Sequence, residues 1–395
     1  MKFRHLAVAA SSILALVILL EVVAYIGLQV REMTKPNVSD VHKKLLARDG
    51  IDARDQYREL KSVYNDLVTL EPYRWYAIPR AFQGNHISTD AYGFRNSMGQ
   101  TLYSQSKRIG FFGGSTMFGI TSKLAHTIPS LVAEALKPEL AQTFNFGIGA
   151  YSTSSELMTF VEVSRLKHYD IKYAIFYDGV NELGRYIEKL QDHQSNPIYE
   201  AIGYPYVASL RPAASDFSKS TGGLQVQYQP ALVQIWKQIE LRFNRSKNIN
   251  YILSDDDIER HAEIIYRIYA NNVLDIDAIA KSRGIQAIFL WQPSLFSIRD
   301  RQLTESERDI LKSEAIAKKL SDSLNTRVRR GNELRRIKFF DLSAEFDKLS
   351  SEEHFYDCCH VDADGNRLIA MRIVDILRQF LPSDYFQVIG SRTLQ

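Results

Sequence analysis

From residue 107 onward, short apolar runs alternate with stretches of helical periodicity. The apolar runs cover residues 109–112, 144–148, 173–177, 287–291 and 337–342. They are continuous, whereas a strand with one solvated face would alternate apolar and polar residues, so they are typical of parallel strands covered on both sides. This order of strands and helices predicts a doubly wound α/β domain.

Four helical segments are predicted by different signals. One covers residues 128–136, and the charged stretch 304–336 also has helical period. A capping box, Thr153-Ser154-Ser155-Glu156, predicts a helix that begins there and runs to about Lys167. The last helix is indicated by apolar residues spaced for one face, namely Ile369, Ile373, Ile376 and Phe380. Asp362 is expected to cap that helix.

The N-terminus carries a different hydrophobic pattern. After the basic stretch at residues 1–5, residues 6–30 are apolar with one charge, Glu21. About 20 apolar residues suffice to span a bilayer, so residues 1–30 are predicted to be an uncleaved transmembrane anchor. A cleaved signal peptide and a buried soluble helix remain alternatives. The short basic start favours an N-terminus in the cytoplasm and a catalytic domain in the periplasm, anchored to the inner membrane.

Two further segments interrupt the α/β pattern. Residues 31–105 are polar and mixed, and are predicted to form a membrane-proximal extension that is helical to about Leu70 and then extended. The main domain is expected at 106–385. Within it, residues 191–256 are rich in Tyr, Pro, Ser and Gly, and form an insertion too long for a plain connection.

Composition excludes several classes of protein. Of 395 residues, 45% are hydrophobic and 24% charged, which excludes intrinsic disorder. The 49 Lys and Arg against 46 Asp and Glu give a net charge of +3, so nucleic acid is not expected as a partner. The two cysteines are adjacent, Cys358-Cys359, which excludes a disulfide-dense scaffold and a Cys-rich zinc module. Two thiols are expected there, because a disulfide between neighbours is strained.

Chemistry-bearing residues follow the predicted strands. The first strand runs into Gly113-Gly114-Ser115-Thr116, the second into residues 145–151, and the third into Gly179-Val180-Asn181-Glu182. Asp357-Cys358-Cys359-His360 stands before the last helix. Loops at the carboxyl ends of parallel strands meet at one edge of the sheet. They bring a hydroxyl, an imidazole, a carboxylate and an amide, which are the parts of a serine hydrolase.

These four blocks, in this order, resemble the SGNH (GDSL) family of hydrolases and acyltransferases over about residues 85–381. The nucleophile block is the Gly-Gly-Ser-Thr variant, with Gly114 in place of the usual Asp, and Glu182 replaces the final Asp of the third block. The resemblance implies a three-layer α/β/α, flavodoxin-like fold with a parallel sheet. It does not cover the N-terminal span or the 191–256 insertion.

The resemblance also implies a role for each residue. Ser115 is expected to be the nucleophile, His360 the general base and Asp357 the acid that orients it. The oxyanion would be bound by the backbone N–H of Ser115, the side-chain amide of Asn181 and the backbone N–H of Ala150, which stands where the family has a Gly. No metal and no cofactor are expected.

The resulting expectation is an esterase or O-acyltransferase that acts through an acyl-enzyme on Ser115. Its substrate would be an acylated glycan or lipid of the cell envelope, with acetyl as one candidate acyl group. The alternative is a non-catalytic SGNH-like module that binds glycan and supports envelope assembly. The sequence does not determine the acyl chain length, the acceptor or the oligomeric state.

Overall fold

The computed structural model describes residues 40–66, 69–71, 75–98, 106–191 and 253–387, together with Leu20, Glu21, Tyr25 and Gln100. The chain divides into two compact units, residues 1–38 with 210–253 and residues 39–209 with 254–395. Nearly all described residues belong to the second unit. The 191–256 insertion lies almost entirely outside the described residues.

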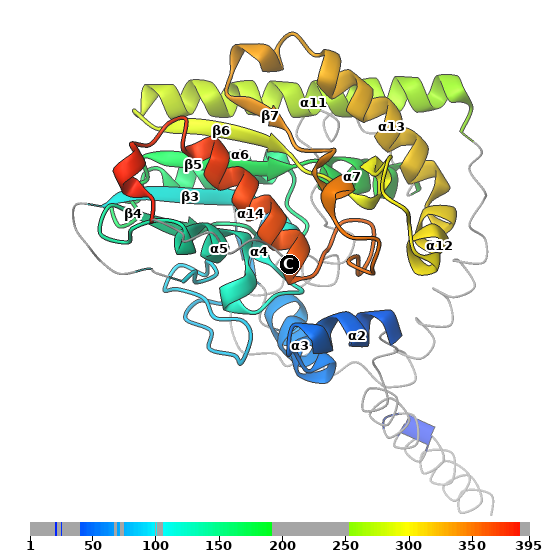
Figure 1. Ribbon diagram of the computed structural model, residues 1–395, viewed down its shortest axis with the longest axis horizontal. Coiled ribbons are helices and arrows are strands. Elements are labelled where there is room, and N and C mark those ends of the chain that lie inside the picture. The colour runs from blue at the N-terminus through cyan, green and yellow to red at the C-terminus, as the bar shows by residue number, and fades with distance from the viewer. Residues whose placement is uncertain are drawn as a thin grey trace, which may run out of the picture. The chain divides into compact units, whose positions relative to one another are not determined.

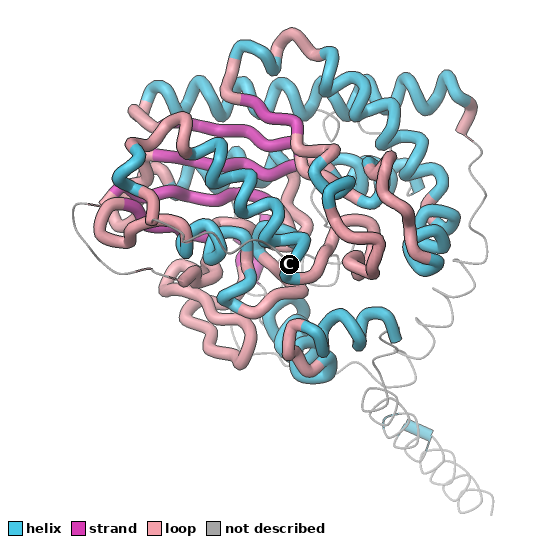
Figure 2. Tube along the Cα trace, in the orientation of Figure 1, coloured by secondary structure: helices cyan, strands magenta, loops and turns pink. Residues whose placement is uncertain are grey.

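The second unit contains a five-stranded sheet with the order β4-β3-β5-β6-β7, in which every neighbouring pair is parallel. The strands are β3 (Lys107–Gly113), β4 (Ala141–Asn145), β5 (Tyr173–Asp178), β6 (Gln286–Trp291) and β7 (Phe339–Asp341). Each of the five overlaps one of the apolar runs that predicted strands, although β4 shares only Phe144 and Asn145 with its run. Figure 2 shows the strands as one layer between helices. The α/β prediction is therefore confirmed.

The helices lie between and around these strands (Figure 1). In chain order they are α4 (Ser115–Phe118), α5 (Ile128–Glu134), α6 (Thr153–Val163), α7 (Val180–Gln191), α11 (Asp255–Ser282), α12 (Glu305–Ser313), α13 (Ala315–Arg330) and α14 (Ala363–Leu377). Short 3-10 turns cover Leu124–His126, Leu295–Ser297, Leu334–Arg336, Glu345–Lys348 and Ser383–Tyr385. Asp362 accepts a hydrogen bond from the Gly365 N–H and caps α14, as predicted.

Helices cover both faces of the sheet, which gives three layers. On one face, apolar side chains of β3, β5 and β6 pack with those of α5 and α14 into the main core cluster. On the other face, Phe112, Phe176 and Phe289 stack across three strands, with ring centroids 4.8 and 5.2 Å apart. Phe160 of α6 packs edge-on against the first two rings, and α11 lies against β6. Burial on both faces explains why these strands are continuously apolar.

The extension from residue 40 to 98 belongs to the same compact unit. It forms α2 (Asp40–Arg48), α3 (Ala53–Lys61), a π-helical turn (Ser62–Asp66), and the antiparallel pair β1 (Thr69–Glu71) and β2 (Trp75–Ala77). The single helix expected to Leu70 is therefore wrong. The chain turns between α2 and α3 at Gly50, whose φ of +67° is favourable only for glycine.

The predicted membrane span is almost entirely outside the described residues. Of residues 6–30, only Leu20, Glu21 and Tyr25 are described, and each is helical. Within the part of the chain that the structure describes, no helix combines the length and the apolar character needed to cross a bilayer.

The capping-box prediction for α6 is wrong in its mechanism. The helix begins at Thr153 as expected, but its N-cap is Ser152, which makes no side-chain cap hydrogen bond. Instead, the Thr153 N–H donates to the carboxylate of Glu182, 2.7 Å away. Glu156 turns into the interior and is 1% exposed. A tertiary contact has replaced the local cap that the sequence pattern indicated.

Candidate active site

Three predicted residues form one chain of hydrogen bonds. Ser115 Oγ lies 2.7 Å from His360 Nε2, and His360 Nδ1 lies 2.7 Å from Asp357 Oδ2. Ser115 begins α4, directly after β3, and the other two stand in the loop before α14. The arrangement is that of a nucleophile, a base and the acid that orients the base.

The loop that carries Asp357 and His360 is a narrow hairpin. Phe355 and Val361 pair as an antiparallel bridge, and the Tyr356 N–H donates to the His360 carbonyl at 2.9 Å. At its tip, Asp357 Oδ1 accepts from the backbone N–H groups of Cys359 and His360, at 2.9 and 2.8 Å. Both Asp357 oxygens are thus engaged, which fixes the carboxylate against the imidazole ring.

The charge state of Asp357 follows from these contacts. Partial burial works to raise its pKa, but the adjacent His360 and the hydrogen bonds from His360 and Cys359 outweigh that effect. The pKa of Asp357 is held well below its usual range. The group is therefore a carboxylate at neutral pH, able to stabilise a positively charged imidazole beside it.

Asn181 lies close to the nucleophile turn. Its side-chain amide donates to the Tyr151 carbonyl at 2.7 Å, which occupies one of its two N–H groups. A Cβ atom on Gly114 would lie 1.8 Å from Asn181 Nδ2. A glycine at position 114 is therefore required for Asn181 to stand where it does, which couples two segments that the sequence treats separately.

Ala150 adopts a left-handed backbone conformation with φ of +59°. A residue with a Cβ atom does so at a cost of about 1–2 kcal/mol. The alanine therefore stores strain at this point of the chain. Such strain persists only where surrounding contacts determine the backbone.

Those contacts come from the extension, which the sequence did not connect with the site. The N–H of Gly149 donates to the Tyr64 hydroxyl at 3.1 Å, and the Tyr76 hydroxyl donates to the Gly149 carbonyl. The residue before Ala150 is therefore held at both of its backbone polar groups. The tyrosines of this segment are scattered through the sequence, and their spacing does not indicate a contact with the strand ends.

Arg95 of the extension holds the loop that follows the nucleophile. Its guanidinium is 1% exposed and donates only to backbone carbonyls, those of Phe118, Gly119, Ser122 and His86, at 2.5–2.9 Å. Burial lowers the pKa of Arg95 to about 10, so the side chain remains charged at neutral pH. The carbonyl oxygens stabilise this charge and are in turn fixed by it.

Helix α2 reaches the third catalytic segment. Arg48 donates to the Glu353 carbonyl and to Asp362, both at 3.2 Å, and Asp49 accepts from the Ala363 N–H at 3.1 Å. Asp362 also pairs with His354 at 3.0 Å across the base of the hairpin. The extension thus contacts three of the four segments that carry the predicted site residues.

Buried carboxyl groups lie beside the Asn181 loop. Asp178 at the end of β5, Glu156 and Glu182 are 3%, 1% and 6% exposed. Burial, together with the nearby Glu182 carboxylate, raises the pKa of Asp178 to about 8. Burial and the neighbouring carboxyl groups of Asp178 and Glu182 raise the pKa of Glu156 well above its usual range. Near neutral pH, protons on Asp178 and Glu156 remove most of the repulsion between their carboxyl groups and that of Glu182. Glu182 can then accept the hydrogen bond from the Thr153 N–H at the start of α6.

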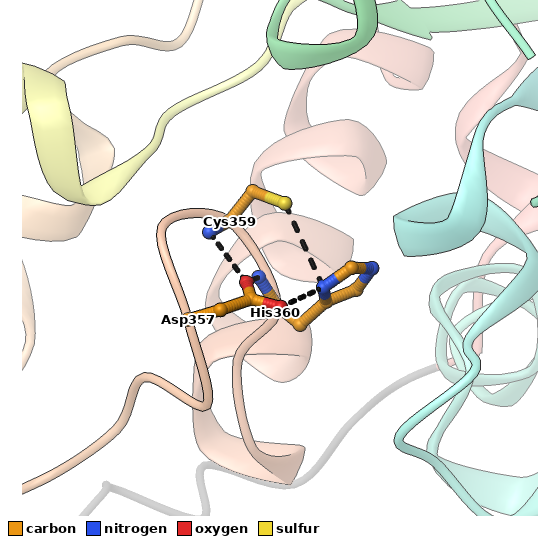
Figure 3. Close-up of side chains that lie close together, drawn as sticks. All are labelled: Asp357, Cys359 and His360. Atoms are coloured by element: carbon orange, nitrogen blue, oxygen red, sulfur yellow. Dashed lines mark hydrogen bonds and ion pairs between the residues drawn. The ribbon is translucent and has the colours of Figure 1, made fainter. Parts of the chain in front are cut away.

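The two cysteines are thiols, as predicted. Cys359 lies under the catalytic hairpin, with Sγ 3.6 Å from His360 Nδ1 (Figure 3).

No protein-family model matches the chain, and no curated protein matches it. Solved structures similar to it include a GDSL-like lipase from Bacteroides thetaiotaomicron, with 13% identity over 70% of this chain and 89% of that one, and a TM-score of 0.35. Another is a carbohydrate acetylesterase from Sinorhizobium meliloti, with 11% identity over 70% of this chain and 100% of that one, and a TM-score of 0.37. A catalytic mutant of an acetylxylan esterase from Geobacillus stearothermophilus has 12% identity over 69% of this chain and 95% of that one, with a TM-score of 0.36. Similarity this low assigns neither a family nor an activity to this chain.

The Tyr64 contact can be tested by removing its hydroxyl. Tyr64→Phe leaves the Gly149 N–H without its partner, so the free energy of unfolding should fall by about 1–3 kcal/mol. Tyr57→Phe is the matched control, because Tyr57 is 43% exposed and lies in the neighbouring α3. Its effect should stay within about 0.5 kcal/mol. Equal stability of the two variants in urea unfolding would contradict the assigned role of Tyr64.

Proposed function

We propose that the chain is an SGNH-type serine esterase that cleaves or transfers an acyl group through a covalent intermediate on Ser115. The observation that carries the proposal is the hydrogen-bonded series from Ser115 through His360 to Asp357. A hydroxyl within 2.7 Å of an imidazole, whose other nitrogen meets a carboxylate, is the arrangement that activates a serine nucleophile.

The proposed reaction has two steps. His360 Nε2 takes the Ser115 proton as Oγ attacks the ester carbonyl, and Asp357 stabilises the resulting imidazolium. His360 then gives this proton to the leaving alkoxide, and an acyl-enzyme remains. Water, or a hydroxyl of an acceptor, attacks the acyl-enzyme with His360 again as base. Water makes the protein an esterase, and a glycan hydroxyl makes it an O-acyltransferase.

The oxyanion formed in each step needs hydrogen-bond donors. We assign the second N–H of the Asn181 amide, the backbone N–H of Ser115 and the backbone N–H of Ala150 to this role. Support comes from the position of Asn181 against Gly114, the residue before the nucleophile, and from the Gly149 contacts that fix the backbone next to Ala150.

The proposed setting is the cell envelope, with residues 6–30 in the inner membrane and the catalytic domain in the periplasm. The substrate is then an acylated glycan or lipid of that compartment. The rival function, a non-catalytic module that binds glycan, would need no aligned nucleophile and base. The short Ser115–His360 and His360–Asp357 distances favour the enzyme.

The catalytic assignment is tested by substitution and by covalent labelling. Ser115→Ala and His360→Ala should each reduce kcat on an activated ester by on the order of 10⁴-fold or more, and the double variant should be little worse, since members of a triad act as a unit. A fluorophosphonate probe should label the native chain and spare Ser115→Ala. Losses that multiply in the double variant would contradict a shared mechanism.

The chain offers a matched control for this experiment. Ser350 Oγ lies 2.8 Å from His354 Nε2, and His354 pairs with Asp362, so a second Ser–His–Asp series exists in the same domain. Ser350→Ala should leave labelling and turnover unchanged. If Ser350→Ala abolished labelling and Ser115→Ala left it unchanged, Ser350 would be the nucleophile and the proposal for Ser115 would be rejected.

Asn181 can either donate a hydrogen bond to the oxyanion or only stabilise the fold through its hydrogen bond to the Tyr151 carbonyl. Asn181→Ala should lower kcat by about 10²–10³-fold with little change in KM if the amide binds the oxyanion. If its only role is the hydrogen bond to Tyr151, the variant should lose about 1 kcal/mol of stability and keep near-normal kcat. Measuring kcat and Tm together separates these outcomes, and a lowered Tm with normal kcat rejects the oxyanion role.

The membrane anchor is tested on the full chain in cells. Because residues 6–30 are long enough to span a bilayer, the protein should remain in the membrane pellet after a carbonate wash. A version that begins near Arg31 should be released into the soluble fraction and retain ester hydrolysis. Full-length protein recovered in the supernatant with its N-terminus intact would contradict the anchor.

A further inference from the structure

The face of His360 that points away from Ser115 meets two other potential metal ligands. Asp357 Oδ2 lies 2.7 Å and Cys359 Sγ lies 3.6 Å from the same atom, His360 Nδ1. One ligand atom from each of the three residues lies within 4.8 Å of the others. Figure 3 shows the thiol and the carboxylate both facing this nitrogen.

We propose that Asp357, Cys359 and His360 form an inhibitory binding site for a thiophilic divalent metal ion, with Zn²⁺ as the natural candidate. Thiolate, imidazole and carboxylate are the three ligand types of zinc in proteins. Tetrahedral zinc places a bound sulfur and nitrogen about 3.5 Å apart and a bound nitrogen and oxygen about 3.4 Å apart. The Cys359–His360 separation already fits, and the Asp357–His360 pair needs to open by less than one ångström.

Metal ions can reach this set from solvent. The Asp357 side chain is 44% exposed and that of His360 is 12% exposed. Glu314 lies close enough for its charge to act on Asp357, and it accepts a hydrogen bond from the Cys358 thiol. A second carboxylate beside the three ligands increases the local attraction for a cation.

Binding would block the base through the position of one proton. In the resting triad the single proton of neutral His360 sits on Nδ1, facing Asp357, and Nε2 accepts from Ser115. A metal ion on Nδ1 moves that ring proton to Nε2, and the Cys359 thiol releases its proton to solvent. Nε2 then donates to Ser115 and can no longer deprotonate it. This inhibitory consequence rests on the proposed function, whereas the metal binding itself does not.

The other cluster of this kind among the described residues lacks these properties. His354, Asp362 and Asp364 also bring three ligand atoms within 4.8 Å. However, the Arg48 guanidinium lies 3.2 Å from Asp362, and the cluster contains no thiol. A cation there would meet an existing positive charge, so the cluster beside Ser115 is the site we assign.

The inhibition is tested by titrating the full-length protein with Zn²⁺ during ester hydrolysis. Cys358→Ser is the matched control, because it removes the neighbouring thiol and keeps all three proposed ligands. It should be inhibited at the same Zn²⁺ concentration as the native protein. Cys359→Ser should need at least about tenfold more Zn²⁺, each rate being compared with that of the same variant without metal. Equal inhibition of the native protein and Cys359→Ser would overturn the proposal.

A spectroscopic measurement tests the site without turnover. Co²⁺ added to the full-length Ser115→Ala variant should produce a thiolate-to-cobalt charge-transfer band in the near ultraviolet. The band should persist in Ser115→Ala/Cys358→Ser and be absent from Ser115→Ala/Cys359→Ser. Absence of the band in Ser115→Ala, or its dependence on Cys358, overturns the metal site. A normal band in Ser115→Ala, combined with native protein that hydrolyses no ester, would instead reject the proposed function and leave the metal site standing.

Discussion

The hydrogen bond between Ser115 and His360 joins residues 245 positions apart, and the rest of the site is arranged around it. Such a contact requires two loops to be held at the same edge of the sheet to within a few tenths of an ångström. The parallel strands supply the first part of this constraint, because they place the carboxyl ends of β3, β4 and β5 side by side. Ser115 and Asn181 each follow the end of one of these strands.

The second part of the constraint comes from outside the sheet. The loops at its edge carry backbone polar groups that are buried and need partners. Arg95 binds the carbonyls after the nucleophile, Tyr64 and Tyr76 bind Gly149, and Arg48 binds the base of the catalytic hairpin. The segment that the sequence predicts to be a membrane-proximal extension is thus part of the scaffold of the candidate site. A strained residue such as Ala150 can persist there because its surroundings fix its backbone.

The histidine at the centre of the site has two faces with different chemistry. Nε2 faces the nucleophile, and Nδ1 faces a carboxylate and a thiol. A carboxylate alone holds the ring in the tautomer that activates Ser115. The thiol beside it adds a soft ligand of the kind that thiophilic metal ions bind. The same loop geometry therefore supports both the proposed catalysis and its proposed inhibition.

The sequence by itself determined the α/β class and the site residues that meet. Continuous apolar runs marked all five strands, and the four blocks placed Ser115, Asn181, Asp357 and His360 at strand ends or in one loop. Both signals are local, because a short run of neighbouring residues shows whether a strand is buried and which functional groups a loop carries. The sequence also predicted the Asp362 cap and the two thiols.

Tertiary structure decided the contacts between distant segments. The local pattern at Thr153–Glu156 predicted a self-contained cap, but Glu182 satisfies the Thr153 N–H and Glu156 is buried. The fit of Asn181 against Gly114 and the roles of Arg95, Tyr64 and Arg48 likewise have no local signature. A buried arginine is stabilised by carbonyls that come from other parts of the chain, and no spacing within one segment encodes which carbonyls they are.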